Sequence, residues 1–247
     1  MKNVLAVIII VSLGYTLYGT AMLGVRIFTG KKISDRSVSF QNSASPERYR
    51  ILIVGDSTGV GTGAETPEDS IAGLILRDYP ETTIENRAEN GAKFADVISQ
   101  LDEETSDYYD LILIQAGGND ILRFTSLDTL RDNVGTLLRT AKERAQHVVF
   151  MSTGNVGNAP AFMPPLSWVY TSRTRKVRKI LMEVAEAEGV VYVDLFMERS
   201  DDPFVSEPER YNAPDFLHPG SEGYRLWYEA LKTQAHLDEL IGKQPAE

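Results

Sequence analysis

Short apolar runs alternate with amphipathic segments along most of the chain. Five runs have the length and composition of strands, at residues 50–55, 82–86, 111–116, 147–151 and 190–195. Five segments carry apolar residues at helical spacing, at residues 70–78, 94–101, 127–145, 168–188 and 222–241. Apolar strands separated by helices predict a parallel sheet covered on both faces. The pattern therefore predicts an α/β protein, a three-layer α/β/α sandwich around a flavodoxin-like five-stranded parallel sheet, with residues 82–86 as an edge-like strand.

The N-terminus has a different pattern. Residues 4–25 contain no charged side chain, and such a run of 22 residues is long enough to cross a bilayer core as a helix. We therefore predict an N-terminal hydrophobic helix that attaches the protein to a membrane as an anchor. The alternative is a cleaved signal peptide, with Gly19-Thr20-Ala21 as its small-residue cleavage site, which would give a secreted protein.

The N-terminal segment also bears on which side of the membrane the rest of the chain lies. Basic residues flank the apolar run on both sides, so their distribution does not decide the orientation. A short N-terminus normally stays in the cytosol, so we expect the large domain outside the cytoplasm, in a periplasmic or extracellular position. We predict an anchor or signal segment at 1–28, a polar linker at 29–47 and the folded domain at 48–247.

Composition narrows the possible chemistry. The chain has 35 acidic and 25 basic residues and a formal net charge of −10, which argues against non-specific nucleic-acid binding. It has no cysteine, which excludes disulfides, cysteine nucleophiles and zinc–thiolate sites, and its three histidines argue against a histidine-rich metal site. We therefore expect a mechanism that needs no metal and no other cofactor.

Residues with chemical functions stand where the predicted strands end. In parallel α/β sheets, ligands bind beyond the carboxyl ends of the strands. Ser57 follows the first predicted strand, Gly91 the second and Asn119 the third, and the pair Asp215 and His218 precedes the last predicted helix. Aspartate and histidine three residues apart on one turn can meet, which leaves the other imidazole nitrogen free to face a serine.

These residues provide a complete set of roles for acyl transfer. Ser57 would attack a carbonyl carbon while His218 takes its proton and later passes it to the leaving group, and Asp215 would fix the imidazole. The backbone N–H groups of Ser57 and Gly91, with the side-chain amide of Asn119, would form the oxyanion hole.

The four motifs, in this order, resemble those of the SGNH (GDSL-type) hydrolases, a family of esterases and lipases. The serine, glycine, asparagine and histidine of the family name match Ser57, Gly91, Asn119 and His218, and the family's aspartate matches Asp215. The resemblance covers about residues 50–235. It implies the flavodoxin-like sandwich and a serine hydrolase acting on esters: lysophospholipids, short acyl esters, thioesters or O-acetylated sugars.

The substrate is predicted only as a class. The hydrophobic N-terminal helix favours lipid esters or esters of envelope polysaccharides, and the pattern does not indicate an oligomeric state. The loop at 155–166 is rich in proline and small residues, and we expect it to line the substrate pocket through Phe162 and Met163.

Two other functions are compatible with parts of the sequence. Residues 59–64 match the dinucleotide-binding pattern G-x-G-x-x-A, although the first glycine lies too far beyond the strand. A catalytically silent protein that only binds a ligand is the second alternative. It would be supported if a catalytic residue were missing, and none is missing.

Overall fold

A five-stranded parallel sheet forms the centre of the molecule. The structure is a computed structural model that describes residues 2–102 and 108–241. The strands lie in the order β2-β1-β3-β4-β5. Their bounds are β1 Tyr49–Gly55, β2 Thr82–Asn86, β3 Tyr109–Gln115, β4 Ala145–Met151 and β5 Val191–Val193. The predicted flavodoxin-like sheet is confirmed, with β2 at an edge.

The burial of each strand follows its sequence pattern. The apolar run Ile51–Val54 in β1 is at most 1% exposed, because helices cover both faces of the sheet there. β1 pairs with β3 from Ile51 opposite Leu111 to Gly55 opposite Gln115, so the two strands end side by side. In β2, buried and half-buried residues alternate, as expected for an edge strand.

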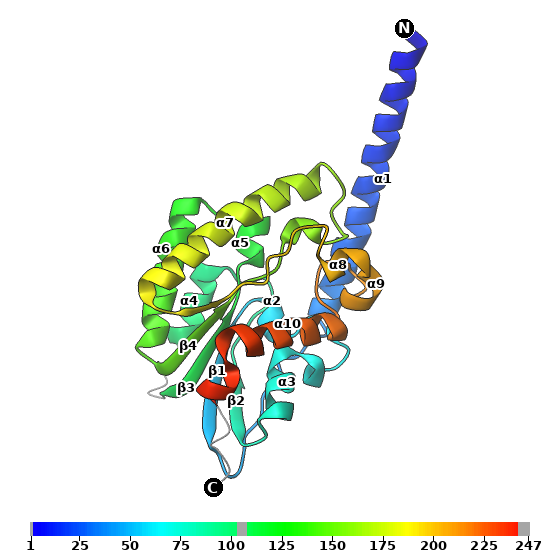
Figure 1. The fold of residues 1–247 in the computed structure, drawn as a ribbon. Helices are drawn as coiled ribbons and strands as arrows, with labels where there is room; N and C mark the ends of the chain where they lie inside the picture. The colour runs from blue at the N-terminus through cyan, green and yellow to red at the C-terminus, as the bar shows by residue number, and fades with distance from the viewer. Residues whose placement is uncertain (1, 103–107, 242–247) are drawn as a thin grey trace.

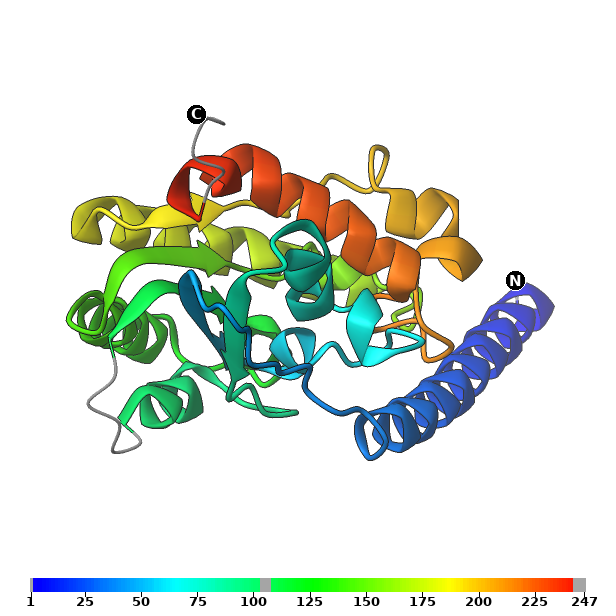
Figure 2. The same cartoon turned by 90° about the horizontal axis from the view of Figure 1, so that it is seen from below.

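Two layers of helices enclose the sheet (Figures 1 and 2). One hydrophobic cluster joins a sheet face to α4, α6 and α7, and the other joins the opposite face to α3 and α10. The bounds are α3 Ile71–Asp78, α4 Phe94–Asp102, α6 Leu127–Lys142, α7 Leu166–Glu188 and α10 Ser221–Ala235. This arrangement confirms the three-layer α/β/α sandwich.

Short helices stand at the carboxyl edge of the sheet, where sequence patterns gave no helix. α2 (Ser57–Val60) follows β1 and α5 (Gly118–Leu122) follows β3. α8 (Pro203–Ser206) and α9 (Pro208–Tyr211) each begin at a proline, which suits the first helical turn. All four helices are too short to show a periodic apolar pattern. α8 and α9 lie in the chain shortly before Asp215.

The last predicted helix ends earlier than expected. α10 stops at Ala235 because His236 has a φ of 50°, in the left-handed region, and the separate helix α11 (Leu237–Leu240) follows. The apolar positions continue across this break, since Ala235 and Leu237 are both buried, and therefore the sequence pattern did not reveal it.

The N-terminal helix α1 spans Lys2–Ser34 without interruption, so the boundary expected at residue 28 lies inside a helix. Its segment Asn3–Ser34 is long and apolar enough to cross a membrane, by length and composition alone, and contains an 18-residue stretch with a mean hydropathy of 2.0. Figures 1 and 2 show α1 projecting from the domain. Its last turns pack on the domain, where Leu23 reaches the core and Gly30 is buried.

Candidate active site

Ser57 stands at the first position of α2, directly beyond β1. Asp56 caps the helix, because its carboxylate accepts hydrogen bonds from the backbone N–H of Thr58 at 2.9 Å and from the Thr58 hydroxyl at 2.8 Å. The strand can end this close to β3 only with a glycine, since a Cβ on Gly55 would lie 1.9 Å from the carbonyl oxygen of Gln115. The turn thus holds the Ser57 hydroxyl in a fixed direction.

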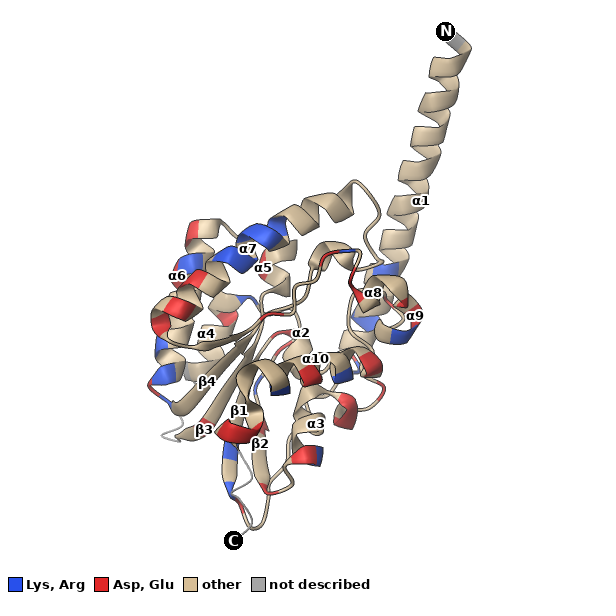
Figure 3. Cartoon of the chain, in the orientation of Figure 1, with Lys and Arg blue, Asp and Glu red and all other residues tan. Residues whose placement is uncertain are grey.

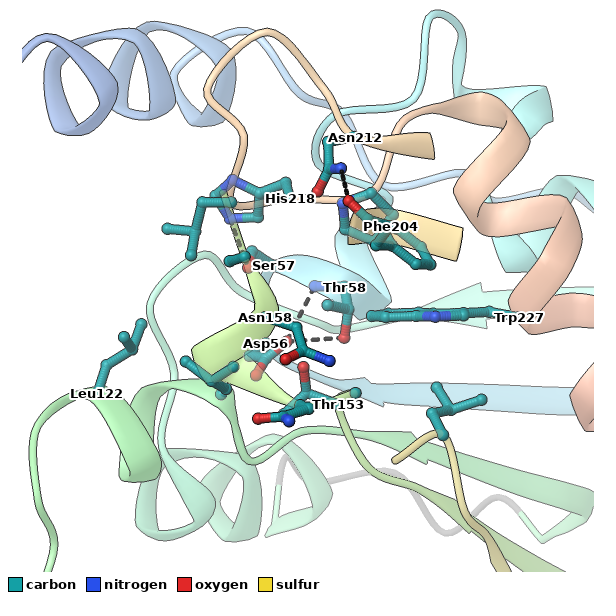
Figure 4. Close-up of a pocket in the computed structure, with 18 of the residues that line it drawn as sticks. Asp56, Ser57, Thr58, Leu122, Thr153, Asn158, Phe204, Asn212, His218 and Trp227 are labelled. Atoms are coloured by element: carbon teal, nitrogen blue, oxygen red, sulfur yellow. Dashed lines mark hydrogen bonds between the residues drawn. The ribbon is translucent and has the colours of Figure 1, made fainter. Parts of the chain in front are cut away.

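The structure brings the three predicted catalytic side chains into one hydrogen-bonded chain. The Nε2 atom of His218 lies 3.0 Å from Oγ of Ser57, and its Nδ1 atom lies 2.6 Å from Oδ2 of Asp215. Figure 4 shows His218 beside Ser57 with the interaction drawn. The second carboxylate oxygen of Asp215 accepts the backbone N–H groups of Leu217 and His218, each at 3.0 Å. These three contacts fix the carboxylate against the imidazole.

The environment of Asp215 favours its ionised form. The side chain is fully buried, which opposes ionisation, but the hydrogen bond and positive charge of His218 and the two backbone N–H groups outweigh burial and lower the Asp215 pKa. An ionised Asp215 holds a proton on Nδ1 of His218 and leaves Nε2 able to accept the proton of Ser57.

The glycine-rich segment after Ser57 supports the histidine loop by close packing. Gly63 has a φ of 101°, and a Cβ there would lie 2.3 Å from the carbonyl oxygen of Pro219, next to His218. Gly61 has a φ of 86° and ends α2. These contacts give Gly61 and Gly63 of the dinucleotide-like pattern a structural role.

Gly91 and Asn119 line the same pocket as Ser57 and His218. Gly91 has a φ of 82°, a conformation that glycine adopts without strain. Asn119 lies in the first turn of α5, beyond the end of β3. The neighbouring Asp120 instead accepts the backbone N–H of Phe94 at 2.9 Å in a buried position, which ties α5 to α4. Burial raises the pKa of Asp120.

The pocket around Ser57 has a volume of about 600 Å³ and extends in two directions. On one side it is walled by apolar residues near α8 and α10, which include Phe204, Trp227 and Ala230. Figure 4 shows Phe204 and Trp227 facing this space. On the other side it is walled by the end of α1, through Arg26, Ile27, Gly30, Lys31 and Ser34. Sequence reasoning missed both walls, because no local pattern indicates which distant helices meet at the site.

Phe162 and Met163 lie away from this pocket, contrary to the expectation for the loop at 155–166. Phe162 is 8% exposed and belongs to the core, with its ring centroid 4.6 Å from that of Tyr170. The backbone N–H of Phe162 donates a hydrogen bond to the carbonyl oxygen of Ala159 at 2.9 Å, and this turn directs the chain inward. Met163 faces α1, with its sulfur 3.7 Å from the point where a Cβ on Gly19 would stand. The same loop reaches the pocket through Asn155, Val156, Asn158 and Ala159.

Within residues 2–102 and 108–241, no three His, Asp or Glu side chains gather in a way that could hold a metal ion.

Comparison with known proteins places this chain in a class of hydrolases. Residues 53–226 match the family model described as the GDSL-like lipase/acylhydrolase family, which is well over half of the chain. The chain therefore belongs to the GDSL-like lipase/acylhydrolase family. It is similar to a GDSL-like esterase from Mycobacterium tuberculosis, with 25% identity over 86% of this chain and 77% of the relative.

Solved structures share the fold. A lipase/acylhydrolase from Enterococcus faecalis superposes with a TM-score of 0.60 at 21% identity, covering 81% of this chain and all of that one. The psychrotrophic esterase EstA from a Pseudoalteromonas species gives a TM-score of 0.55 at 18% identity, covering 77% of this chain and 98% of that one. At these identities the similarity establishes the fold alone.

Proposed function

We propose that this protein is a membrane-anchored serine hydrolase that cleaves carboxylic esters through an acyl-enzyme intermediate. The observation that carries the proposal is the continuous chain of hydrogen bonds from buried Asp215 through His218 to Ser57, which opens into a cavity of about 600 Å³. Family membership supports the hydrolase class.

The reaction would proceed in two steps. The Oγ atom of Ser57 attacks the ester carbonyl carbon as its proton passes to Nε2 of His218; the C–O bond then breaks, and the alcohol leaves with that proton. Water next attacks the acyl-enzyme, giving one proton to His218, and the carboxylic acid leaves as Ser57 regains its proton. Asp215 stabilises the imidazolium in both steps.

Charge on the carbonyl oxygen develops in each step and needs donors beside Ser57. The candidates are the backbone N–H groups of Ser57 and Gly91 and the side-chain amide of Asn119, three residues that line one pocket. The removal of one such donor typically lowers turnover by about 10²- to 10³-fold.

The apolar wall near Trp227, Phe204 and Ala230 is suited to an acyl chain, and the wall formed by α1 is suited to the alcohol part of the ester. With the apolar helix α1, this favours lipid esters, lysophospholipids among them, over O-acyl sugars. We expect the catalytic domain on the extracytoplasmic side.

The proposal is tested by the hydrolysis of p-nitrophenyl esters of increasing acyl length by the full chain in detergent. We expect Ser57→Ala and His218→Ala each to lower kcat by about 10⁴-fold or more, and the double variant to lose no more than either single variant. His236→Ala, at an exposed position, is the matched histidine control and should keep wild-type kcat.

Two results would contradict the proposal. Equal turnover by wild type and Ser57→Ala would exclude Ser57 as the nucleophile. A folded wild-type protein that hydrolyses no ester in the series would favour a silent ligand-binding protein.

A further inference from the structure

The end of α1 is joined to the catalytic loop by specific contacts. Arg26 donates a hydrogen bond to the carbonyl oxygen of Pro214 at 2.9 Å, and its guanidinium lies 3.9 Å from the ring centroid of Phe216. Gly30 packs so closely on the loop that a Cβ there would lie 2.9 Å from Oδ2 of Asp215. The helix with the composition of a membrane span is therefore also a wall of the catalytic pocket.

The uncharged part of α1 ends where the pocket begins. Val25 is the last residue of the uncharged run, and Arg26, the next residue, lines the pocket. One residue is about 1.5 Å along a helix axis, so a bilayer that held residues 4–25 would end at the pocket. Lys31 also lines the pocket, which puts a second cation at the depth of lipid headgroups.

A second uncharged segment runs beside α1. Residues 153–172, which include the loop before α7 and the first turns of that helix, contain no charged side chain. The Tyr15 hydroxyl of α1 donates a hydrogen bond to the carbonyl oxygen of Pro164 at 2.8 Å, and Met163 lies against Gly19. Figure 3 shows no charged residue on the projecting part of α1 or at the start of α7, whereas the domain end of α1 carries basic residues.

This second segment exposes large apolar side chains. Trp168 is 68% exposed and Val169 is 47% exposed, both in the first turn of α7. The first charged residue of α7 is Arg173, whose guanidinium is turned back to the carbonyl oxygen of Thr125. Exposed tryptophan is typical of the membrane interface, where its ring is buried and its N–H stays near water.

We propose that the segment Met163–Val169 enters the membrane beside α1, in the leaflet nearer to the catalytic domain. The catalytic pocket therefore opens at the headgroup level and takes esters of bilayer lipids. The occupant of this surface is the bilayer, because the surface continues the apolar face of α1 without an intervening charge. The substrate class rests on the proposed ester hydrolysis, whereas the seating of Trp168 in lipid does not.

Tryptophan fluorescence tests the seating independently of activity. The chain has two tryptophans, exposed Trp168 and nearly buried Trp227, so each can be observed alone. The full chain is reconstituted in phosphatidylcholine vesicles with brominated acyl chains. We expect Trp227→Phe, which reports Trp168 alone, to lose most of its emission relative to the same variant in vesicles without bromine.

A charge at the same position tests the substrate class. We expect Trp168→Glu to lower the hydrolysis of a lysophosphatidylcholine in vesicles by about tenfold, without changing the hydrolysis of soluble p-nitrophenyl acetate. Met182→Glu, an exposed position further along α7, is the matched control and should change neither rate.

Three outcomes would overturn the proposal. Unquenched Trp168 in vesicles that hold α1 would exclude its seating in lipid, and a cross-link between Trp168 regions of two copies would assign the surface to a dimer instead. An equal loss on both substrates in Trp168→Glu would exclude a membrane role. If the wild type hydrolyses no ester, the proposed function fails, and quenching alone still decides the seating.

Discussion

Two buried aspartates near Ser57 have opposite electrostatic environments. Asp215 is surrounded by a histidine ring and two N–H groups, which lower its pKa despite burial. Asp56, one residue before Ser57, is 1% exposed, and its burial raises its pKa although Thr58 and His218 favour the charge. The protein thus favours the ionised form of Asp215, which contacts His218, and disfavours the ionised form of Asp56, which caps α2.

This difference predicts a pH-dependent effect of Asp56→Asn. A folded-state pKa raised above the ordinary value of 3.8 means that the native state binds the proton more tightly, so stability falls as pH rises from that value towards the folded pKa. Asparagine has no proton to release and avoids this loss. The melting temperature of Asp56→Asn relative to wild type should therefore increase as the pH rises above about 4.

Asp128→Asn, at an exposed position of α6, is the control for this series. A melting-temperature difference that stays constant with pH, or that decreases as pH rises, would contradict the account of Asp56.

At the scale of residues, the sequence predicts local chemistry better than distant contacts. Ser57, Asp215 and His218 could be predicted, because each follows from its position beside a strand or from a three-residue spacing. Trp227 and Gly30 could not, because their place at the pocket depends on how α10 and α1 pack on the sheet. Phe162 was placed wrongly at the pocket for the same reason.

At the scale of elements, α1 has two parts with different environments. A Cβ on Gly24 would have no other group within 4 Å, whereas Gly30 is buried against Asp215. Glycine in a helix costs up to about 1 kcal/mol relative to alanine, so its presence at position 30 needs a packing reason, and the contact with the catalytic loop supplies one.

The pair Gly30→Ala and Gly24→Ala tests this contact in a matched way. Both changes favour the helix equally, but only the Cβ at position 30 would press on Oδ2 of Asp215. We expect Gly30→Ala to lower kcat for p-nitrophenyl acetate by about ten- to a hundredfold with little change in KM, because a small displacement of a catalytic group is costly. Gly24→Ala should keep wild-type kcat.

Equal activity of the two alanine variants would contradict the proposed contact between α1 and the catalytic loop. A fall in both would indicate a general effect on α1 instead.

The elements themselves differ in how far they could be predicted. The apolar runs of β1, β3 and β4 placed each strand within two residues, since burial on both faces leaves a continuous signal. The short helices α8 and α9 and the break at His236 depend on backbone angles and proline positions, which periodicity does not report.

At the scale of the whole molecule, an apolar helix and a hydrolase domain form one continuous unit around the pocket. Cleavage after Ala21, at the alternative signal site, would leave Arg26 and Gly30 in place as pocket walls. The architecture of the site is therefore compatible with an uncleaved anchor and with a cleaved signal peptide, and the attachment to a membrane needs a separate test.

We predict that α1 stays with the protein as an anchor. In cells that express the full chain, the protein should remain with membranes through an alkaline carbonate wash and keep its N-terminal segment. Release into the soluble fraction, with a mature N-terminus near Met22, would contradict the anchor and support the signal peptide.

The central claim is that Ser57 is a nucleophile activated by His218. The most direct measurement is the intact mass and peptide map of the full chain in detergent after reaction with a fluorophosphonate, beside Ser57→Ala and His218→Ala. We expect one covalent adduct, located on Ser57 and absent from both variants. An adduct on another residue, or no adduct on a folded wild-type protein, would contradict the claim.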